Sequence, residues 1–198
     1  AGSIDIDSFT STFLNATAVA TTGDALIGAA SAALSVIVTA LDGDAFVGST
    51  ASGLDTIITG RNVGLDSGTV GRNLRLNATG GNIAGSGAIT VSGGIDLDAS
   101  GDIGFGTLAA QGGAFTADAG GGIAFDAASA AGAITFAAGG NVAGGNLTSP
   151  GTVSVTGARV VLGDVIAGAV SLASGSDILF DLIRSTSPVT LTASNGLI

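Results

Sequence analysis

The sequence repeats itself with a period of about 20 residues, and this repeat constrains the fold more than any other feature. The clearest pair of copies is GGIDLDASGDIGFG at residues 93–106 and GAFTADAGGGIAFD at residues 113–126, where Phe105 corresponds to Phe125. A near-constant period of this length is the signature of a solenoid, in which stacked copies share one core. We therefore expect neighbouring repeats to form neighbouring coils, with Phe105 stacked on Phe125.

One apolar position marks the repeat along the chain. The next residue is polar and the residue after that is nearly always apolar, which is the in–out–in alternation of a β-strand. We expect every marker from Leu34 onward to point into one continuous core, and the polar neighbours to point to solvent. The marker residues are Leu14, Leu34, Leu54, Leu74, Ile95, Phe115, Ile134, Val153, Val170 and Val189.

Two further apolar positions recur within each unit, and they suggest three short strands separated by Gly, Asn, Asp or Ser turns. Gly and Ala suit corners where a bulky side chain does not fit or where φ is positive. The first set is Val63, Ile83, Ile103, Ile123, Val142, Val161, Ile178 and Leu197, and the second is Leu108, Ala128, Leu147, Ile166 and Ile183. The pattern predicts an all-β fold, a parallel β-helix of about nine coils with about 20 residues and three short strands per coil.

A single solenoid segment is expected over residues 1–198, with less regular repeats in residues 1–33. The last unit breaks off at TASNGLI, so we expect either part of a longer protein or an open-ended unit that stacks on its own copies.

Composition removes most chemistry. The chain has no Cys, His, Met, Trp or Tyr, all its acidic residues are Asp and all its basic residues are Arg. Histidine triads, thiol nucleophiles, Schiff-base lysines and zinc sites are therefore excluded. A net charge of −10 argues against nucleic acid and anionic membrane surfaces as partners. We expect no enzyme activity and no cofactor, apart from a weak association with calcium.

One segment, ALIGAASAALSVIVTAL at residues 25–41, is long and uncharged. Its length is at the lower limit of the roughly 17–25 residues of a membrane-spanning helix. Neither Lys nor Trp nor Tyr flanks it, and it is in step with the repeat. We therefore predict two buried coils here and no membrane insertion.

The units GGIDLDASGDIGFGTLAAQ, GAITFAAGGNVAGGNLTSPG and AVSLASGSDILFDLIRSTSPVTLTASNGLI resemble the repeats of large bacterial exoproteins. The similar families are the filamentous-haemagglutinin-like exoproteins of two-partner secretion and the passenger domains of autotransporters. The resemblance covers residues 34–198 well and residues 1–33 loosely. It implies a right-handed parallel β-helix that forms the shaft of an adhesin or surface filament, outside the cell or on the outer surface of a bacterium.

Three carboxylates are the candidate site residues. Asp96 and Asp98 flank Leu97, so both should project outward about 7 Å apart, a separation that inverting glycosidases also use. Asp98 and Asp118 should lie on adjacent coils, where a calcium ion with oxygen ligands would relieve their repulsion. We predict solvated outer carboxylates, with Asp96, Asp98 and Asp118 as a calcium candidate and no catalytic residue.

Asp55, Arg75 and Asp96 each follow a marker residue and should form an exposed charge ladder. An anion or sugar contact at Arg75 is the functional alternative. The same column continues in Thr and Ser, but the position two residues on is irregular, which argues against ice binding.

The sequence thus predicts an extracellular structural or adhesive β-helix. Its expected partners are a host or neighbouring-cell surface, a polysaccharide, or further copies joined through open solenoid ends. The alternatives are a self-assembling filament or sheath subunit and a polysaccharide-acting β-helix enzyme.

Overall fold

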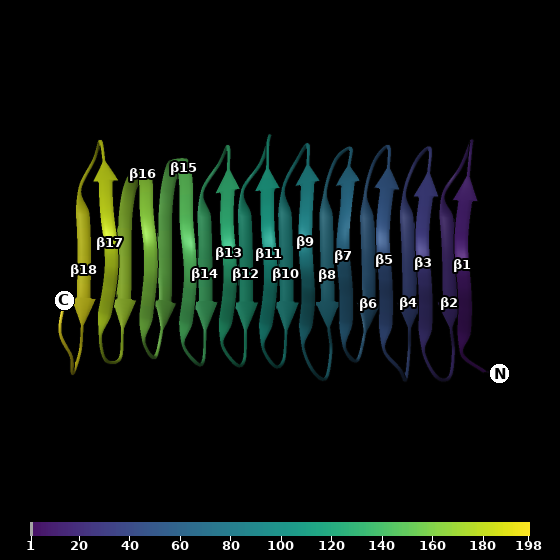
Figure 1. Ribbon diagram of the computed structural model, residues 1–198, viewed down its shortest axis with the longest axis horizontal. Coiled ribbons are helices and arrows are strands. Elements are labelled where there is room, and N and C mark those ends of the chain that lie inside the picture. Colours follow the sequence, from purple (N-terminus) through teal and green to yellow (C-terminus); the bar gives the residue numbers. More distant parts are fainter. Residues whose placement is uncertain (1) are drawn as a thin grey trace.

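Each repeat forms one turn of a parallel β-solenoid (Figure 1). The computed structural model describes residues 2–198 and has about 10 turns of about 19 residues. We number the coils from the amino terminus, so that coil 1 begins with β1 and coil 10 begins with β17. The expected all-β solenoid is confirmed, with one coil more than predicted because the residues before position 33 pair like the rest.

A coil consists of a long strand followed by a short strand that runs back (Figure 1). The long strands are β1 (Ile4–Ser11), β3 (Ala25–Ala32), β5 (Ala45–Ser52), β7 (Val63–Val70), β9 (Ile83–Val91), β11 (Ile103–Ala110), β13 (Ile123–Ala130) and β17 (Ile178–Ser185). The short strands are β2 (Ala16–Ala20), β4 (Val36–Ala40), β6 (Thr56–Gly60), β8 (Leu74–Ala78), β10 (Ile95–Ala99), β12 (Phe115–Ala119), β14 (Ile134–Ala138) and β18 (Val189–Ala193). In coils 8 and 9, β15 (Val142–Gly157) and β16 (Val160–Ser174) run through both parts without a break.

Every strand pairs in parallel with its equivalent in the next coil. Ile103 lies opposite Ile123, and Ile95 lies opposite Phe115. The step between coils varies, from 21 residues between Ile4 and Ala25 to 17 between Val153 and Val170, because the turns differ in length. One uninterrupted backbone ladder therefore runs the length of the molecule.

The structure divides eight of the ten coils into two strands, and coils 8 and 9 into one continuous strand each, where the sequence suggested three. In β13 the inward residues are Ile123 and Phe125, then Ala128 and Ala130, so the alternation changes phase in the middle of the strand. This bend turns the second half of the long strand toward the core. One long strand thus takes the place of two of the three short strands expected.

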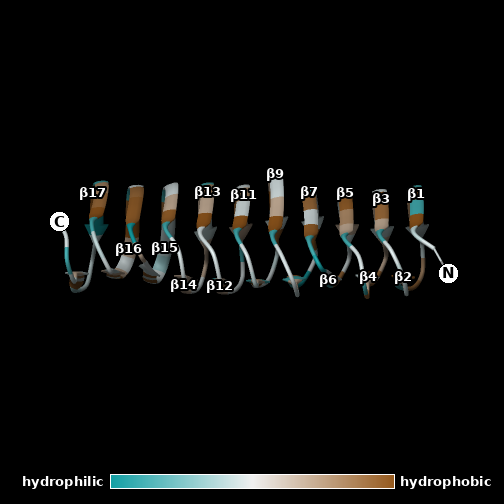
Figure 2. Ribbon diagram, turned by 90° about the horizontal axis from the view of Figure 1, so that it is seen from below, coloured by the Kyte–Doolittle hydropathy of each residue, from teal (hydrophilic) through white to brown (hydrophobic). Residues whose placement is uncertain are grey.

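The core is a continuous apolar column between the long strands and the short strands. Figure 2 shows these two rows of strands, with hydrophobic residues coloured brown along many of the long strands. Its widest side chains lie in coils 6 and 7, where Phe105 stacks on Phe125 with ring centres 5.5 Å apart and planes 15° apart. Phe115 and Phe136 pack beside them with their centres 5.0 Å apart. The predicted stacking of Phe105 on Phe125 is confirmed.

The marker residues from Leu74 to Val170 are buried as predicted, and Arg75, Asp96, Thr116 and Thr135 after them are exposed. The markers of the first coils are wrong by two residues. Leu34 is 38% exposed and lies in a turn, and Leu14 and Leu54 occupy the equivalent turn positions. The inward residues at the start of these short strands are Ala16, Val36 and Thr56, which share a column with Leu74.

A steric limit at the end of each short strand explains this offset. The last inward position is always small, and at Gly60 an added Cβ would lie 2.8 Å from the nitrogen of Ala45. If Leu54 began the strand, Ile58 would fall at this position. The residues there are Ala20, Ala40, Gly60, Ala78, Ala99, Ala119, Ala138, Gly157, Ser174 and Ala193.

Four further expectations need correction. Leu197 is 76% exposed and lies after the end of β18, where its backbone N–H donates to Asp177 Oδ1. Val160 and Val165 are the inward residues of β16, whereas Val161 and Ile166 point outward, because the step from β15 to β16 is 18 residues here. Val189 is 45% exposed, since β18 pairs only with β16.

The glycines mainly allow neighbouring coils to approach one another closely, and they rarely provide an unusual backbone angle. Gly23 is the only described residue with positive φ. At Gly145 a Cβ would lie 2.0 Å from the carbonyl oxygen of Asp126 in the preceding coil, so a side chain there would force the coils apart.

The apolar segment at residues 25–41 forms β3 and β4, which pack into coil 2. In the described part of the chain, no helix is long and apolar enough to cross a membrane.

Candidate functional site

The three predicted site carboxylates lie together on the outer face of the short strands. Leu97 is buried, while Asp96 and Asp98 on either side of it are exposed, as predicted. Asp98 lies directly opposite Asp118 in the next coil. Together with Thr116 they line a shallow depression, in which the Thr116 hydroxyl donates a 2.9 Å hydrogen bond to Asp96 Oδ1.

This arrangement limits the chemistry available. The depression carries only carboxylates, hydroxyl groups and short apolar side chains, so its functional groups are oxygen donors and acceptors. Within residues 2–198, no three Asp side chains are grouped so that they could hold one metal ion. Calcium association at Asp98 and Asp118 stays a prediction.

The charge ladder differs from the predicted one. Arg75 lies opposite Asp96, with Nε 3.7 Å from Oδ2. Ile57 is the residue opposite Arg75 on its other side, whereas Asp55 lies two residues earlier, in the turn, and pairs with Arg72. Arg72 Nε donates to Asp55 Oδ1 at 2.8 Å, and the backbone N–H of Asn73 donates to the same oxygen. These hydrogen bonds, that of Arg72 foremost, lower the pKa of Asp55 below its ordinary value.

Two rows of turn side chains, which the sequence analysis missed, connect the coils. In the first turn ladder, the residue before a long strand accepts a hydrogen bond from the backbone N–H of its equivalent one coil on. The bond from Asn82 N to Asn62 Oδ1 measures 2.8 Å, and that from Gly122 N to Asp102 Oδ1 measures 2.7 Å. Its members are Ser3, Asp24, Asp44, Asn62, Asn82 and Asp102, with Gly122 as the donor to Asp102, and the same bond recurs in the last coil from Leu197 N to Asp177 Oδ1.

The second turn ladder precedes the short strands and works in the same way. Ser35 N donates to Asn15 Oδ1 at 3.0 Å, and Gly94 N donates to Asn73 Oδ1 at 3.0 Å. Its members are Asn15, Ser35, Asp55 and Asn73, and it stops at Gly94, which has no side-chain acceptor. The recurrence of Asn, Asp or Ser just before each apolar strand was the available signal.

Coil 3 contains a buried hydroxyl cluster that the sequence did not reveal. Thr56 Oγ1 lies 3.2 Å from Thr50 Oγ1 and 2.9 Å from Ser52 Oγ, and Ser52 donates to the carbonyl of Leu54. No buried side-chain nitrogen or oxygen in residues 2–198 lacks a hydrogen-bond partner. The cluster is therefore a satisfied part of the core.

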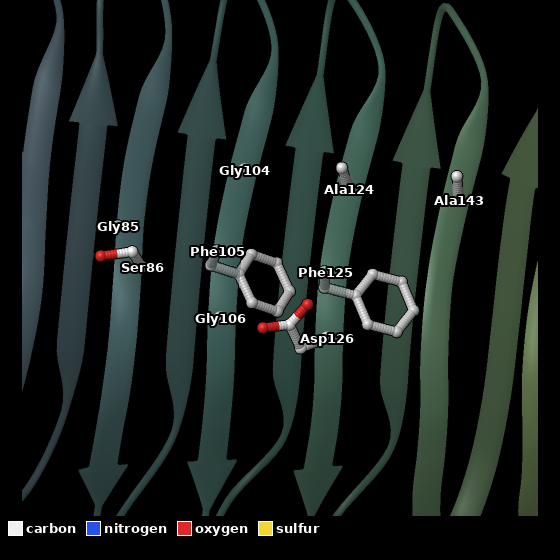
Figure 3. Close-up of a pocket in the computed structure, with 9 residues that line it drawn as sticks. All are labelled: Gly85, Ser86, Gly104, Phe105, Gly106, Ala124, Phe125, Asp126 and Ala143. Atoms are coloured by element: carbon white, nitrogen blue, oxygen red, sulfur yellow. The ribbon is translucent and has the colours of Figure 1, made fainter.

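A second shallow depression lies on the long strands β9, β11, β13 and β15 (Figure 3). The rings of Phe105 and Phe125 lie beside it, with Gly104 and Ala124 on its surface and Asp126 at its edge. It is apolar, open and acidic on one side, which suits contact with a ligand and provides no reactive group.

Compared with protein families, curated proteins and solved structures, this chain shows no match to any of them.

Proposed function

We propose that this chain is the shaft of a bacterial surface or secreted protein, with a structural or adhesive role and no catalytic activity. The observation that supports this most is continuity: parallel pairing joins all the coils, and the described strands are connected by only two to four residues. Stacked coils of this kind are mutually dependent, so the structure resists local opening.

The role of a shaft is to hold the parts attached to its two ends at a fixed distance from each other. With coils spaced about 4.8 Å apart, the described chain provides about 45 Å of rigid spacing. We propose right-handed winding, as the resemblance to bacterial exoproteins implies; an experimental structure tests the hand directly. The outer faces would contact a host or neighbouring-cell surface or a polysaccharide.

A self-assembling filament subunit is the second candidate. In the described chain β1 and β2 pair on one side only, as do β17 and β18, and such free parallel edges recruit further strands. Sedimentation of the isolated 198-residue chain at increasing concentration distinguishes the candidates, because a filament subunit would form a series of linear oligomers.

The polysaccharide-acting enzyme is the third candidate, and it depends on Asp96 and Asp98. We expect no release of reducing ends from a panel of polysaccharides. Release that is abolished by Asp96→Asn or Asp98→Asn would replace the structural role with catalysis.

The structural role itself is tested by protease resistance, force and location. Trypsin should cut slowly at Arg61 and Arg159, since both lie in two-residue turns between paired strands. Pulling on single molecules should release coils in small successive steps, and antibodies should label the segment on intact producing cells. Rapid cleavage at Arg61, or labelling only after lysis, would contradict the proposal.

A further inference from the structure

From coil 2 onward, the second residue of each long strand belongs to an apolar stripe on the outside of the solenoid, and in coil 1 this position is Asp5. These residues point outward, and each lies opposite the next in the strand register. The apolar stripe consists of Leu26, Phe46, Gly64, Ala84, Gly104, Ala124, Ala143, Val161 and Leu179.

The apolar stripe is hollowed in its middle and accessible over most of its length, except at Gly64, which is buried beside the ring of Phe46. Phe46 is 42% exposed near one end and Leu179 is 41% exposed at the other. Between them, Gly104, Ala124 and Ala143 are small and are shared by two adjoining shallow depressions. The middle of the stripe is thus an open apolar trough, and Figure 3 shows its floor.

Carboxylates follow both sides of the apolar stripe. Those on the first side belong to the turn before each long strand, and those on the second side belong to the fourth position of the long strand. Together they include eight of the 15 Asp residues of the chain. The first side carries Asp24, Asp44, Asp102 and Asp177, which accept backbone N–H groups, and also Arg159, whose Nε lies 3.6 Å from Asp177 Oδ2. The second side carries Asp7, Asp66, Asp126 and Asp181.

The carboxylates of the second side are evenly spaced. They come from coils 1, 4, 7 and 10, and glycine or Ser86 occupies the same position in the coils between. Three coils at about 4.8 Å each place successive carboxylates about 14 Å apart. In an extended peptide, every fourth residue points to the same side and recurs at about the same distance.

The charge of a ligand and the area that it would bury indicate which kind of ligand fits this surface. A polyanion is repelled. A neutral polymer leaves the second-side carboxylates, which have no hydrogen-bond or ion-pair partner within the described residues, without a cation. A second copy would bring the same acidic sides together. The contact would bury about 400 Å² on each partner, for a stripe about 43 Å long and about 10 Å wide. Stable protein interfaces bury about 800 Å² per partner. A polycationic extended peptide matches the charge, the spacing and the apolar floor.

We propose that the apolar stripe and its flanking carboxylates bind an extended segment of a partner protein with a cationic side chain at every fourth residue. Apolar residues midway between these cations face Gly104, Ala124 and Ala143, while the cations reach Asp66, Asp126 and their equivalents. This binding goes beyond the proposed shaft, which needs no ligand, so its failure leaves the structural role intact.

The probe is a fluorescent peptide of about 13 residues with Lys at every fourth position, Val midway between successive Lys and Thr elsewhere. A peptide of the same composition with Lys at every third position is its control. Fluorescence anisotropy should show that the period-four peptide binds more tightly and weakens as salt is raised. Equal affinity of the two peptides, or affinity independent of salt, would overturn the proposal.

Matched variants locate the site. Ala124→Arg blocks the trough, whereas Thr135→Arg makes the same charge change on the short strand of the same coil. We expect about a tenfold loss of affinity with Ala124→Arg and no comparable loss with Thr135→Arg. Asp126→Asn should weaken binding more than Asp98→Asn. Equal effects within either pair, with all variants folded by circular dichroism, would place binding elsewhere, and dimerisation through the stripe would identify a second copy as its occupant.

Discussion

Coils 2–5 and coils 6–8 reach the same coil shape with different stabilising contacts. In coils 2–5, Asp, Asn and Ser side chains of the two turn ladders accept backbone N–H groups from the next coil, and the core is filled by aliphatic side chains and three hydroxyl groups. In coils 6–8 the turns are mainly Gly and Ala, and four Phe rings pack together in the core. The first region joins its coils at the corners, and the second joins them inside.

The two kinds of contact differ in size. A turn hydrogen bond contributes about 0.5–1.5 kcal/mol net, because the same groups bind water in the unfolded chain. Burying a Phe side chain contributes about 1.5–3 kcal/mol, and a well-oriented ring pair adds roughly 0.5–1.5 kcal/mol. A few rings can therefore replace many turn contacts.

The bulky rings of the aromatic region in coils 6–8 require space in the coil that follows them. At Gly144 an added Cβ would lie 2.3 Å from Cζ of Phe125, so the coil that follows this ring must lack a side chain at that point. In this column the two stacked rings, Phe105 and Phe125, lie between Gly85 and Gly144, so the coil shape is kept by placing glycine on either side of the ring pair.

Removing a central ring should have the largest effect on this comparison. Phe136 is fully buried and contacts Phe105, Phe115 and Phe125. We expect Phe136→Ala to lower the free energy of unfolding by about 3–5 kcal/mol. Denaturant unfolding measures this loss, and Phe13→Ala at an 84% exposed site serves as the control, with a loss below about 0.5 kcal/mol. Similar losses for the two variants would contradict the aromatic core.

A pair of Asn variants tests the turn contacts directly. Asn62 accepts from Asn82 N and donates to Asp44, whereas Asn141 lies in the same column but makes no side-chain hydrogen bond within the described residues. Asn62→Ala should cost about 1 kcal/mol, and Asn141→Ala should cost close to nothing. Denaturant midpoints of the two variants give the difference directly. Equal losses would mean that the first turn ladder does not distinguish the two regions.

The sequence predicts the period, the in–out alternation and the ring stack, because those depend on local patterning of apolar and polar residues. It misplaced Leu34 and Leu54 because a two-residue offset preserves the alternation. The small residues at Ala40 and Gly60 would have resolved this offset, since no larger side chain fits there.

Other features depend on where the long strand bends. Thr50 and Ser52 read as outward polar residues in a regular alternation, and only the change of phase within β5 turns them toward Thr56. The candidate site was placed well for Asp98 and Asp118, because neighbouring coils of 20 residues bring equivalent positions together. The acidic sides of the apolar stripe could not be predicted, since they require the register of all ten coils at once.

Extending the second turn ladder into the aromatic region would sharpen the comparison. The ladder stops at Gly94, and Ala114 and Ala133 occupy the next two places in its column. Ala114 is exposed, so Ala114→Asn has room and its Oδ1 should accept the N–H of Ala133. We expect a gain of about 0.5–1 kcal/mol in unfolding free energy, and none for Ala114→Leu. A gain with both variants would point to a general effect of side-chain size.

The smallest effect concerns Asp55, where the second turn ladder meets an ion pair. Its pKa is lowered in the folded chain, chiefly by the hydrogen bond from Arg72 and also by that from Asn73 N. A carboxyl group with a lowered folded pKa stabilises the fold above its unfolded pKa of about 3.9. That contribution is lost as the pH falls through the folded pKa, because protonation removes the charge that Arg72 pairs with.

Asp55→Asn keeps an acceptor for Asn73 N but removes the charge, so it isolates the ion pair. Because Arg72 is largely exposed, we expect the variant to be less stable than the parent by no more than about 1 kcal/mol at pH 7. The difference should shrink below pH 4 in thermal unfolding measured in parallel. Asp98→Asn, which removes a carboxylate without an Arg partner, is the matched control and should show no loss of stability at pH 7. A deficit for Asp55→Asn that persists unchanged at pH 2 would show that the amide disrupts the turn itself, and that the charge of Asp55 does not stabilise this corner.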